Sequence, residues 1–308
     1  MGEEFVVLSL VPMLIGTLGA VACALPGNFL LLRRQALIGD AISHVVLPGI
    51  VVAFLLTGVV AAWPMMLGAA VAAVIAVVLI EAIRRLGQIE PGAAMGVVFT
   101  TMFAGGVLLL EQSDTSSVHL DVEHALFGNL ESLIWLDATG WSSLWDREAL
   151  SHLPVELPRI AFTLIGVCAF VFLFWRPLKV STFDESFART LGIRVAPLGL
   201  LLVVVAAIAA VAAFDAVGSI IVIAMFICPP AAARMMTNRL EAQIGWSVLF
   251  AMASAILGYV LAGYGPLWFG ANDAVSAAGM IATISGVILA FTARFGPCRT
   301  RNGAPLTL

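Results

Sequence analysis

Asp40 and His44 are the residues whose types and spacing best suit a chemical site. An α-helix turns once in about 3.6 residues, so a spacing of four places both side chains on one face, one turn apart. A carboxylate oxygen and an imidazole nitrogen in that position can hold one divalent ion. Such mixed ligands suit Mn²⁺, Fe²⁺ or Zn²⁺, and the absence of a thiolate argues against Cu(I). Two alternatives stay open: Asp40 could cap a helix, or the two side chains could simply satisfy each other.

Pro48 follows His44 by four residues within the same apolar stretch. Proline has no backbone N–H, so a carbonyl near His44 could be released from helical hydrogen bonding and become a further ligand. Histidine must be neutral to bind a metal ion, so we expect metal binding to weaken at low pH.

A second group of ligand types lies further along the chain, at His119, Asp121, Glu123 and His124. These residues could pass a metal ion inward, or they could belong to an exposed loop without a ligand role. The four cysteines are widely scattered and form no C-x-x-C pair, which argues against a structural zinc site or a redox motif. No G-x-x-x-x-G-K-[ST], G-x-S-x-G or H-E-x-x-H motif occurs, so we expect neither a resident cofactor nor enzymatic activity.

The composition identifies the elements that must position these residues. Of the 308 residues, 61% are hydrophobic and 11% charged, and the mean hydropathy is +1.07. Soluble domains contain about 45–50% apolar and about 25% charged residues. The sequence therefore excludes a disulfide scaffold, a disordered protein and an ordinary cytosolic enzyme, and it predicts an all-α, polytopic transmembrane helical bundle. The formal charge of −4 argues against a nucleic-acid partner.

Nine apolar segments are long enough to cross a bilayer, or eight if one of them is re-entrant. They cover approximately 5–25, 36–57, 63–83, 91–110, 159–176, 197–214, 217–235, 246–264 and 275–293. Nearly all basic residues fall in alternate connections, so the positive-inside rule places the N-terminus outside and the C-terminus in the cytoplasm. We expect one transmembrane domain over residues 1–293 and a cytoplasmic tail over 294–308. No basic region precedes the first apolar segment, which we therefore expect to remain as a span.

Two connections are too long to be simple turns. Residues 111–158 carry nine acids and one base, which predicts either an outer vestibule that concentrates cations or merely a solvated acidic loop. The short apolar runs at 125–130 and 133–136 are expected to cap the outer mouth or to dip into the interface. A pattern of small residues at Gly92 and Gly96 suggests close helix packing.

The second long connection, 181–194, predicts an amphipathic helix on the cytoplasmic side. Ser181 or Thr182, followed by Asp184 and Glu185, is typical of a helix start. An apolar stripe is expected at Phe183, Phe187 and Leu191, with Gly192 ending the helix. Such a helix could lie on lipid or dock on a soluble protein, and its few basic residues favour a protein partner.

Three stretches together resemble the permease subunits of metal-importing ABC transporters, the zinc/manganese/iron family often called ABC-3. The most specific is Arg33–Gly49, which contains Gly39-Asp40-Ala41 and Ser43-His44, followed by Leu47-Pro48-Gly49. The second runs from Phe183 to Ile193, and the third from Ala216 to Arg234. Leu126-Phe127-Gly128-Asn129 also matches. One departure is Cys228-Pro229-Pro230, where many members have Ile-Pro-Ala.

The resemblance implies a multi-pass permease of the bacterial cytoplasmic membrane. Its implied partners are a second permease, identical or paralogous, a cytoplasmic ABC ATPase that binds the ATP, and an extracytoplasmic metal-binding protein. It also implies that Asp40 and His44 coordinate the transported metal ion and that 181–194 is the coupling helix to the ATPase. Two rival functions remain: a proton-coupled secondary transporter for divalent metals, and a permease for a metal chelate or a vitamin B12-type substrate.

Overall fold

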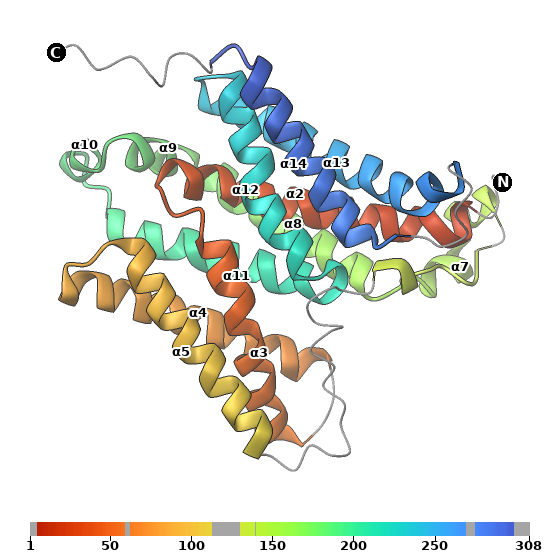
Figure 1. The fold of residues 1–308 in the computed structure, drawn as a ribbon, viewed down its shortest axis with the longest axis horizontal. Helices are drawn as coiled ribbons and strands as arrows, with labels where there is room; N and C mark the ends of the chain where they lie inside the picture. Colours follow the sequence, from red (N-terminus) through yellow and green to blue (C-terminus); the bar gives the residue numbers. More distant parts are fainter. Residues whose placement is uncertain (1–4, 59–61, 113–129, 139, 269–274, 299–308) are drawn as a thin grey trace.

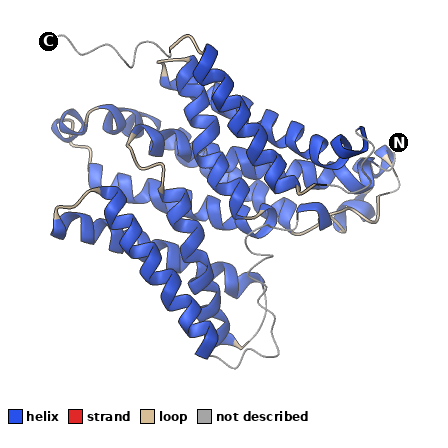
Figure 2. Cartoon of the chain, in the orientation of Figure 1, coloured by secondary structure: helices blue, strands red, loops and turns tan. Residues whose placement is uncertain are grey.

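The computed structural model describes residues 5–58, 62–112, 130–138, 140–268 and 275–298. Over these residues the chain is helical and forms no strand (Figure 2). The helices are α2 (Val11–Leu32), which continues a π-helical turn at Val6–Leu10, α3 (Ile38–Thr57), α4 (Ala62–Gly87), α5 (Pro91–Gln112), α7 (Arg147–Ser151), α8 (Glu156–Leu173), α9 (Trp175–Phe183), α10 (Glu185–Thr190), α11 (Val195–Val217), α12 (Ser219–Met236), α13 (Leu240–Trp268) and α14 (Ala277–Phe295). Two short 3₁₀ turns, η2 (Leu130–Ser132) and η3 (Trp141–Trp145), precede α7.

Nine of the described helical segments are long and apolar enough to cross a membrane, as the sequence predicts. They agree with the expected spans apart from their ends; the eighth begins at Leu240, well before the expected residue 246. The sixth and seventh spans are separated by Gly218 alone, which has a left-handed φ of 81°. The gap that the sequence predicts between spans 197–214 and 217–235 is therefore misplaced, because Asp215 lies within the last turn of α11.

The spans pack as two connected groups. The first group consists of α3, α4 and α5, which pack against one another. In the second group α2 packs against α8, α11, α12 and α13, and α12, α13 and α14 form a further layer. Figure 1 shows the α3–α5 group on one side of the molecule and the layer of α12–α14 on the other. Helix α11 contacts both α2 and α4, so it joins the two groups.

Close contacts between α3 and its neighbours depend on glycine, but not on Gly92 and Gly96. Among the described residues, no atom lies within 4 Å of a β-carbon placed at either of those two positions, so the expected close packing there is not found within this chain. A β-carbon at Gly49 of α3 would lie 2.6 Å from the Gly68 carbonyl oxygen of α4. One at Gly106 of α5 would lie 2.6 Å from the β-carbon of Pro48. The helix that carries Asp40 and His44 thus packs closely against both α4 and α5.

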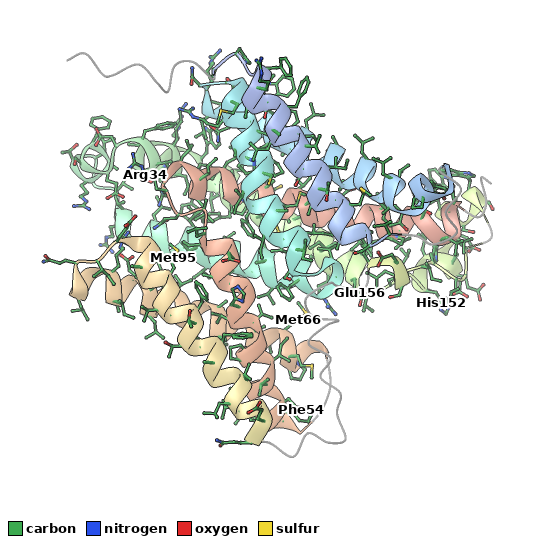
Figure 3. The ribbon with its side chains drawn as sticks, viewed as in Figure 1. Arg34, Phe54, Met66, Met95, His152 and Glu156 are labelled. Carbon is green, nitrogen blue, oxygen red and sulfur yellow. The ribbon has the colours of Figure 1, made fainter. Side chains whose placement is uncertain are left out.

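The segment from Leu130 to Ser151 covers the end of the bundle at which α2 begins. Trp135 is buried, its backbone N–H donates to the Val7 carbonyl (2.9 Å), and its indole Nε1 donates to the Ala149 carbonyl (3.0 Å). Glu131 accepts a hydrogen bond from the backbone N–H of Ala277 at the start of α14 (2.6 Å). The apolar run at 133–136 therefore caps the bundle, one of the two arrangements expected from the sequence. Figure 3 shows His152 and Glu156 in the same region.

Candidate metal-binding pair and coupling segment

Asp40 and His44 both lie on α3, and Asp40 belongs to its first turn. The N-cap position is occupied by Leu37, which makes no side-chain capping bond, so Asp40 is not the N-cap. The Asp40 Oδ1 and His44 Nε2 atoms are 3.6 Å apart, which is too far for a direct hydrogen bond. The structure therefore does not support the N-cap alternative, whereas the distance lies within the range of an ion pair if His44 is protonated, so the alternative in which the two side chains satisfy each other stays open.

The separation of these two atoms suits a shared metal ion. Two ligand atoms that each lie about 2.1 Å from one ion at a tetrahedral angle are about 3.4 Å apart. Both side chains are partly accessible in the isolated chain, His44 at 39% and Asp40 at 35%, so neither is sealed in the core of the helical bundle. The described residues contain no group of three or more acidic, histidine or cysteine side chains that could hold a metal ion, so the pair supplies only part of a coordination sphere.

Two phenylalanines of α5 fix the position of the His44 ring. The ring centroids of His44 and Phe99 lie 5.1 Å apart with the planes inclined by 21°, a stacked arrangement. Phe103, one helical turn further along α5, meets the imidazole edge-on at 5.9 Å. Aromatic pairs prefer these geometries, and together they restrict rotation of the imidazole. Neither phenylalanine was predicted to belong to the site. Their spacing of four places them on one face of a helix, but the sequence does not indicate that this face packs against His44.

Pro48 lies within α3, which continues through it to Thr57. In a regular helix the N–H at position 48 would donate to the carbonyl of His44, and proline has no such N–H. The helix therefore offers the His44 carbonyl oxygen no donor from position 48. That oxygen belongs to the same residue as the candidate imidazole ligand.

The other predicted site residues have different outcomes. His119, Asp121, Glu123 and His124 lie outside the described residues. The expected continuous helix over 181–194 is wrong in its bounds, because α9 ends at Phe183, Asp184 is extended, and α10 covers only Glu185–Thr190. Asp184 is the N-cap of α10, and its Oδ1 accepts from the backbone N–H of Phe187 (2.8 Å). The expected starting residues Ser181 and Thr182 instead lie in the last turn of α9.

The apolar side chains of this segment are nevertheless accessible. Phe183, Phe187 and Leu191 are each exposed by 54–56%. Gly192 follows α10 with a left-handed φ of 79°, and the bonds Gly192 N–H to Arg189 O and Ile193 N–H to Ala188 O form the usual glycine-ended helix terminus. Figure 1 shows α10 at the end of the bundle opposite to α7. We call residues Trp175–Thr190 the α9–α10 segment.

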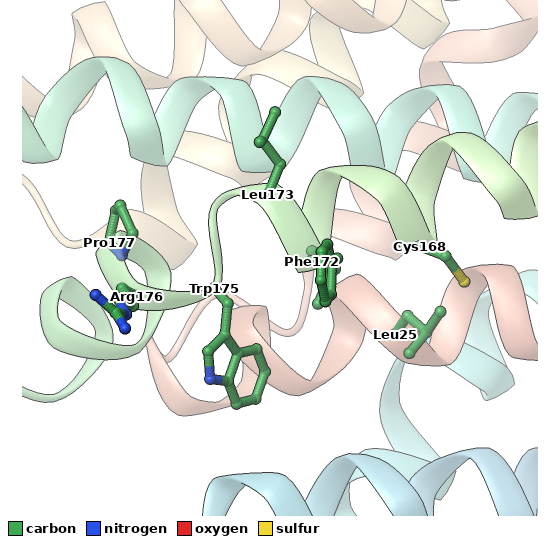
Figure 4. Close-up of a pocket in the computed structure, with 8 residues that line it drawn as sticks. Leu25, Cys168, Phe172, Leu173, Trp175, Arg176 and Pro177 are labelled. Carbon is green, nitrogen blue, oxygen red and sulfur yellow. The ribbon is translucent and has the colours of Figure 1, made fainter.

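A separate hollow of about 630 Å³ lies where α8 meets α9 (Figure 4). Its wall is mainly apolar and includes Cys168, Phe172 and Trp175, with Leu25 of α2. It shares no residue with the Asp40–His44 pair. Nothing in its lining provides a second set of metal ligands.

Comparison with known proteins identifies the family. Residues 8–137 and 151–293 match the ABC 3 transport family. The chain is 37% identical over 288 residues to the manganese transport system membrane protein MntD of Bacillus subtilis, covering 92% of this chain and 90% of that protein. It is 35% identical over 284 residues to the zinc transport system membrane protein TroD of Treponema pallidum, covering 92% of this chain and 73% of that protein.

Solved structures share the fold. The structure of PsaBC from Streptococcus pneumoniae in complex with Fab matches with a TM-score of 0.73 and 24% identity, covering 94% of this chain and 92% of that chain. A second match, an inward-facing putative metal-chelate type ABC transporter, has a TM-score of 0.65 and 15% identity over 92% of this chain and 85% of that chain. The family match extends over most of the sequence and includes the helix with the Asp40–His44 pair, and the chain therefore belongs to the ABC 3 transport family.

Proposed function

We propose that this chain is the membrane-spanning permease subunit of an ATP-driven importer for a divalent transition metal, with Asp40 and His44 as the coordinating pair in the translocation path. The observation that carries this proposal is the 3.6 Å separation of a carboxylate oxygen and an imidazole nitrogen on one face of a membrane helix. Manganese and zinc are the first candidates, because the curated relatives carry those metals in their names. Iron is equally compatible with the two ligand types.

A complete site needs ligands beyond this pair. The His44 carbonyl, released by Pro48, is one candidate, and water or a second permease subunit can supply others. The stacking of His44 on Phe99 holds the imidazole in place before the ion arrives, which lowers the entropic cost of binding. The ion is the cargo, so the site must bind it well in one conformation and poorly in another.

The proposed partners follow from the family and from the α9–α10 segment. The chain has no nucleotide-binding loop, so ATP hydrolysis belongs to a separate cytoplasmic ATPase. The exposed Phe183, Phe187 and Leu191 provide an apolar contact surface for that subunit. An extracytoplasmic binding protein would deliver the ion at the opposite end of the bundle, where the segment from Leu130 to Ser151 lies. A second permease, identical or paralogous, completes the translocation path.

The proposed orientation has the N-terminus outside and the C-terminus in the cytoplasm. Basic residues support it, since they gather in the connections that share a side with the α9–α10 segment. They include Arg33 and Arg34 after α2, Arg84 at the end of α4, Arg239 before α13 and Arg294 at the end of α14. Figure 3 shows Arg34 at the connection between α2 and α3. In a bacterium the chain would then be a multi-pass protein of the cytoplasmic membrane.

Reconstitution tests the proposal. The tagged chain is purified in detergent from its native host with its associated subunits and placed in liposomes, and uptake of Mn²⁺ and Zn²⁺ is measured with and without ATP. We expect co-purification of an ATPase with a phosphate-binding loop and uptake that needs ATP. Asp40→Ala and His44→Ala should abolish uptake while preserving assembly, and Glu90→Ala, outside the pair, should retain it.

Two results would reject parts of this assignment. Uptake that proceeds without nucleotide and follows a proton gradient would identify a secondary transporter instead. Undiminished uptake by both Asp40→Ala and His44→Ala would remove the pair from the translocation path, even if the complex were ATP-dependent.

A further inference from the structure

Arg33 connects the α9–α10 segment to the helix that carries the metal-binding pair. It is the C-cap residue of α2 and stands seven positions before Asp40 in the sequence. Its Nε donates to Thr182 Oγ1 (3.1 Å) and its Nη2 donates to Ser181 Oγ (2.8 Å). Burial lowers the pKa of the Arg33 guanidinium, and the nearby carboxylate of Glu185 opposes that shift. Arg33 is therefore held by the last turn of α9 and lies in the field of the first residue of α10.

The chain between Arg33 and α3 is short and internally bonded. Arg34 has a left-handed φ of 58°, which turns the chain sharply at the end of α2. Three backbone hydrogen bonds hold the turn: Arg34 N–H to Leu31 O (3.0 Å), Gln35 N–H to Leu30 O (2.8 Å) and Ile38 N–H to Gln35 O (3.1 Å). The first two are the paired bonds of a Schellman terminus. Because these bonds make the connection rigid, a displacement of Arg33 would move the start of α3 by a similar amount.

The packing leaves room for such a displacement. A cavity of about 480 Å³ lies between α4, α5, α10 and α11, and its lining includes Arg33, Ile38 and Glu185. Helix α10 packs against α9 and α11, whereas α3 packs against α4, α5, α11 and α12. The Arg33 side chain thus joins the α9–α10 segment to the connection before α3 by hydrogen bonds. Packing of α11 against α3, and of α9 against α2, where Phe29 meets Trp175 edge-on, provides further contacts.

We propose that Arg33 is a positioning residue that transmits movement of the α9–α10 segment to α3, and so changes the setting of Asp40 and His44 during transport. The inference rests on the proposed function, because the movement originates in the ATPase. The guanidinium fork holds two neighbouring hydroxyls in fixed geometry, so it follows α9 both in translation and in rotation. Asp40 lies in the first turn of α3, and that turn moves with the connection.

The test measures coupling in the purified complex with its ATPase in liposomes. The quantities are the divalent ions transported per ATP hydrolysed, the rate of ATP hydrolysis and equilibrium binding of Mn²⁺. Arg33→Gln should keep hydrolysis and Mn²⁺ binding within about twofold of the wild type and lower the transport ratio by about tenfold or more. Arg33→Lys keeps the charge but not the planar guanidinium, so its transport ratio should lie between those of the wild type and Arg33→Gln.

A variant of the hydroxyl partners makes the test independent of the arginine. Ser181→Ala combined with Thr182→Val is nearly isosteric and should reproduce the loss of coupling. Adding Arg33→Gln to it should cause no further loss, because both changes remove one interaction. Lys179→Gln is the matched control: this cation also lies on α9, but it pairs with Glu241 of α13, away from α3, and coupling should be retained.

The results separate this inference from the function it rests on. Absence of ATP-dependent uptake in the wild type would overturn the proposed function. Wild-type uptake with an unchanged transport ratio in Arg33→Gln would overturn only the role of Arg33. Losses that multiply when the variants are combined would also overturn it, since Arg33 would then act through another contact. If Arg33→Gln does not assemble, the Ser181 and Thr182 variant decides: loss of coupling supports the proposal and full coupling overturns it.

Discussion

The imidazole of His44 stacks on the ring of Phe99, with centroids 5.1 Å apart and planes inclined by 21°. The contact joins α3 to α5, and Phe103 of α5 meets the same imidazole edge-on. If His44 binds the ion as proposed, an imidazole held by two rings does so without first losing rotational freedom. The orientation of the His44 ring is therefore set by a neighbouring helix and not by α3 alone.

Removing the stacked ring should weaken metal binding without changing the ligands. Aromatic pairs contribute about 0.5–1.5 kcal/mol beyond their buried area. We expect Phe99→Ala to weaken Mn²⁺ or Zn²⁺ binding by about 3- to 10-fold, measured by equilibrium dialysis of the purified complex. Phe162→Ala on α8, whose ring is 74% exposed, is the control and should bind as the wild type. Equal affinity in Phe99→Ala and the wild type would show that the stacking does not preorganise His44.

The sequence could predict the pair itself because its geometry is local. A spacing of four on a helix fixes the relation of Asp40 to His44 whatever surrounds them. The Phe99 contact depends on how α5 is placed against α3, and Arg33 meets Ser181 across 148 positions of sequence. The residue pattern within one segment does not predict which distant segment will pack against it, so neither contact could be predicted.

The start of the helix expected over 181–194 was misplaced for a physical reason. Ser181, Thr182 and Asp184 are all good capping residues, so local chemistry does not choose among them. In the structure the two hydroxyls accept hydrogen bonds from Arg33, and Asp184 caps α10. Small residues were similarly ambiguous: Gly92 and Gly96 form the familiar pattern, but the close approaches of α3 to α4 and α5 are at Gly49, Gly68 and Gly106.

Neighbouring glycines on α5 should respond in opposite ways to a methyl group. In Gly106→Ala the new carbon would lie 2.6 Å from Pro48 Cβ, so α3 and α5 must separate, at a cost of about 1–3 kcal/mol. In Gly105→Ala the carbon would have no atom of the described part of the chain within 4 Å, and alanine favours the helix. We expect a lower unfolding temperature in detergent and weaker metal binding for Gly106→Ala only. Equal stability of the two variants would contradict the close contact of α3 with α5.

A charge within the α9–α10 segment should disrupt its contact with the ATPase. Phe187 is 54% exposed, and Phe187→Asp would place a carboxylate where an apolar partner surface is expected. We expect the ATPase to be lost on affinity purification while the permease remains folded. Leu136→Asp, an equally drastic change at an exposed residue near the opposite end of the bundle, is the control and should retain the ATPase. Retention of the ATPase by Phe187→Asp would remove this side chain from the interface.

The N-cap of α10 should determine how strongly the exposed apolar surface around Phe187 binds the ATPase. The Asp184 carboxylate accepts from the Phe187 N–H at 2.8 Å, and loss of an N-cap costs about 1 kcal/mol. We expect Asp184→Ala to weaken association with the ATPase by about fivefold in a binding titration, because part of the ordered segment must re-form on docking. Asp184→Asn and Asp184→Ser keep a capping oxygen and should bind nearly as the wild type. If asparagine weakens binding as much as alanine does, then the negative charge of Asp184, and not its capping bond, is what the ATPase requires.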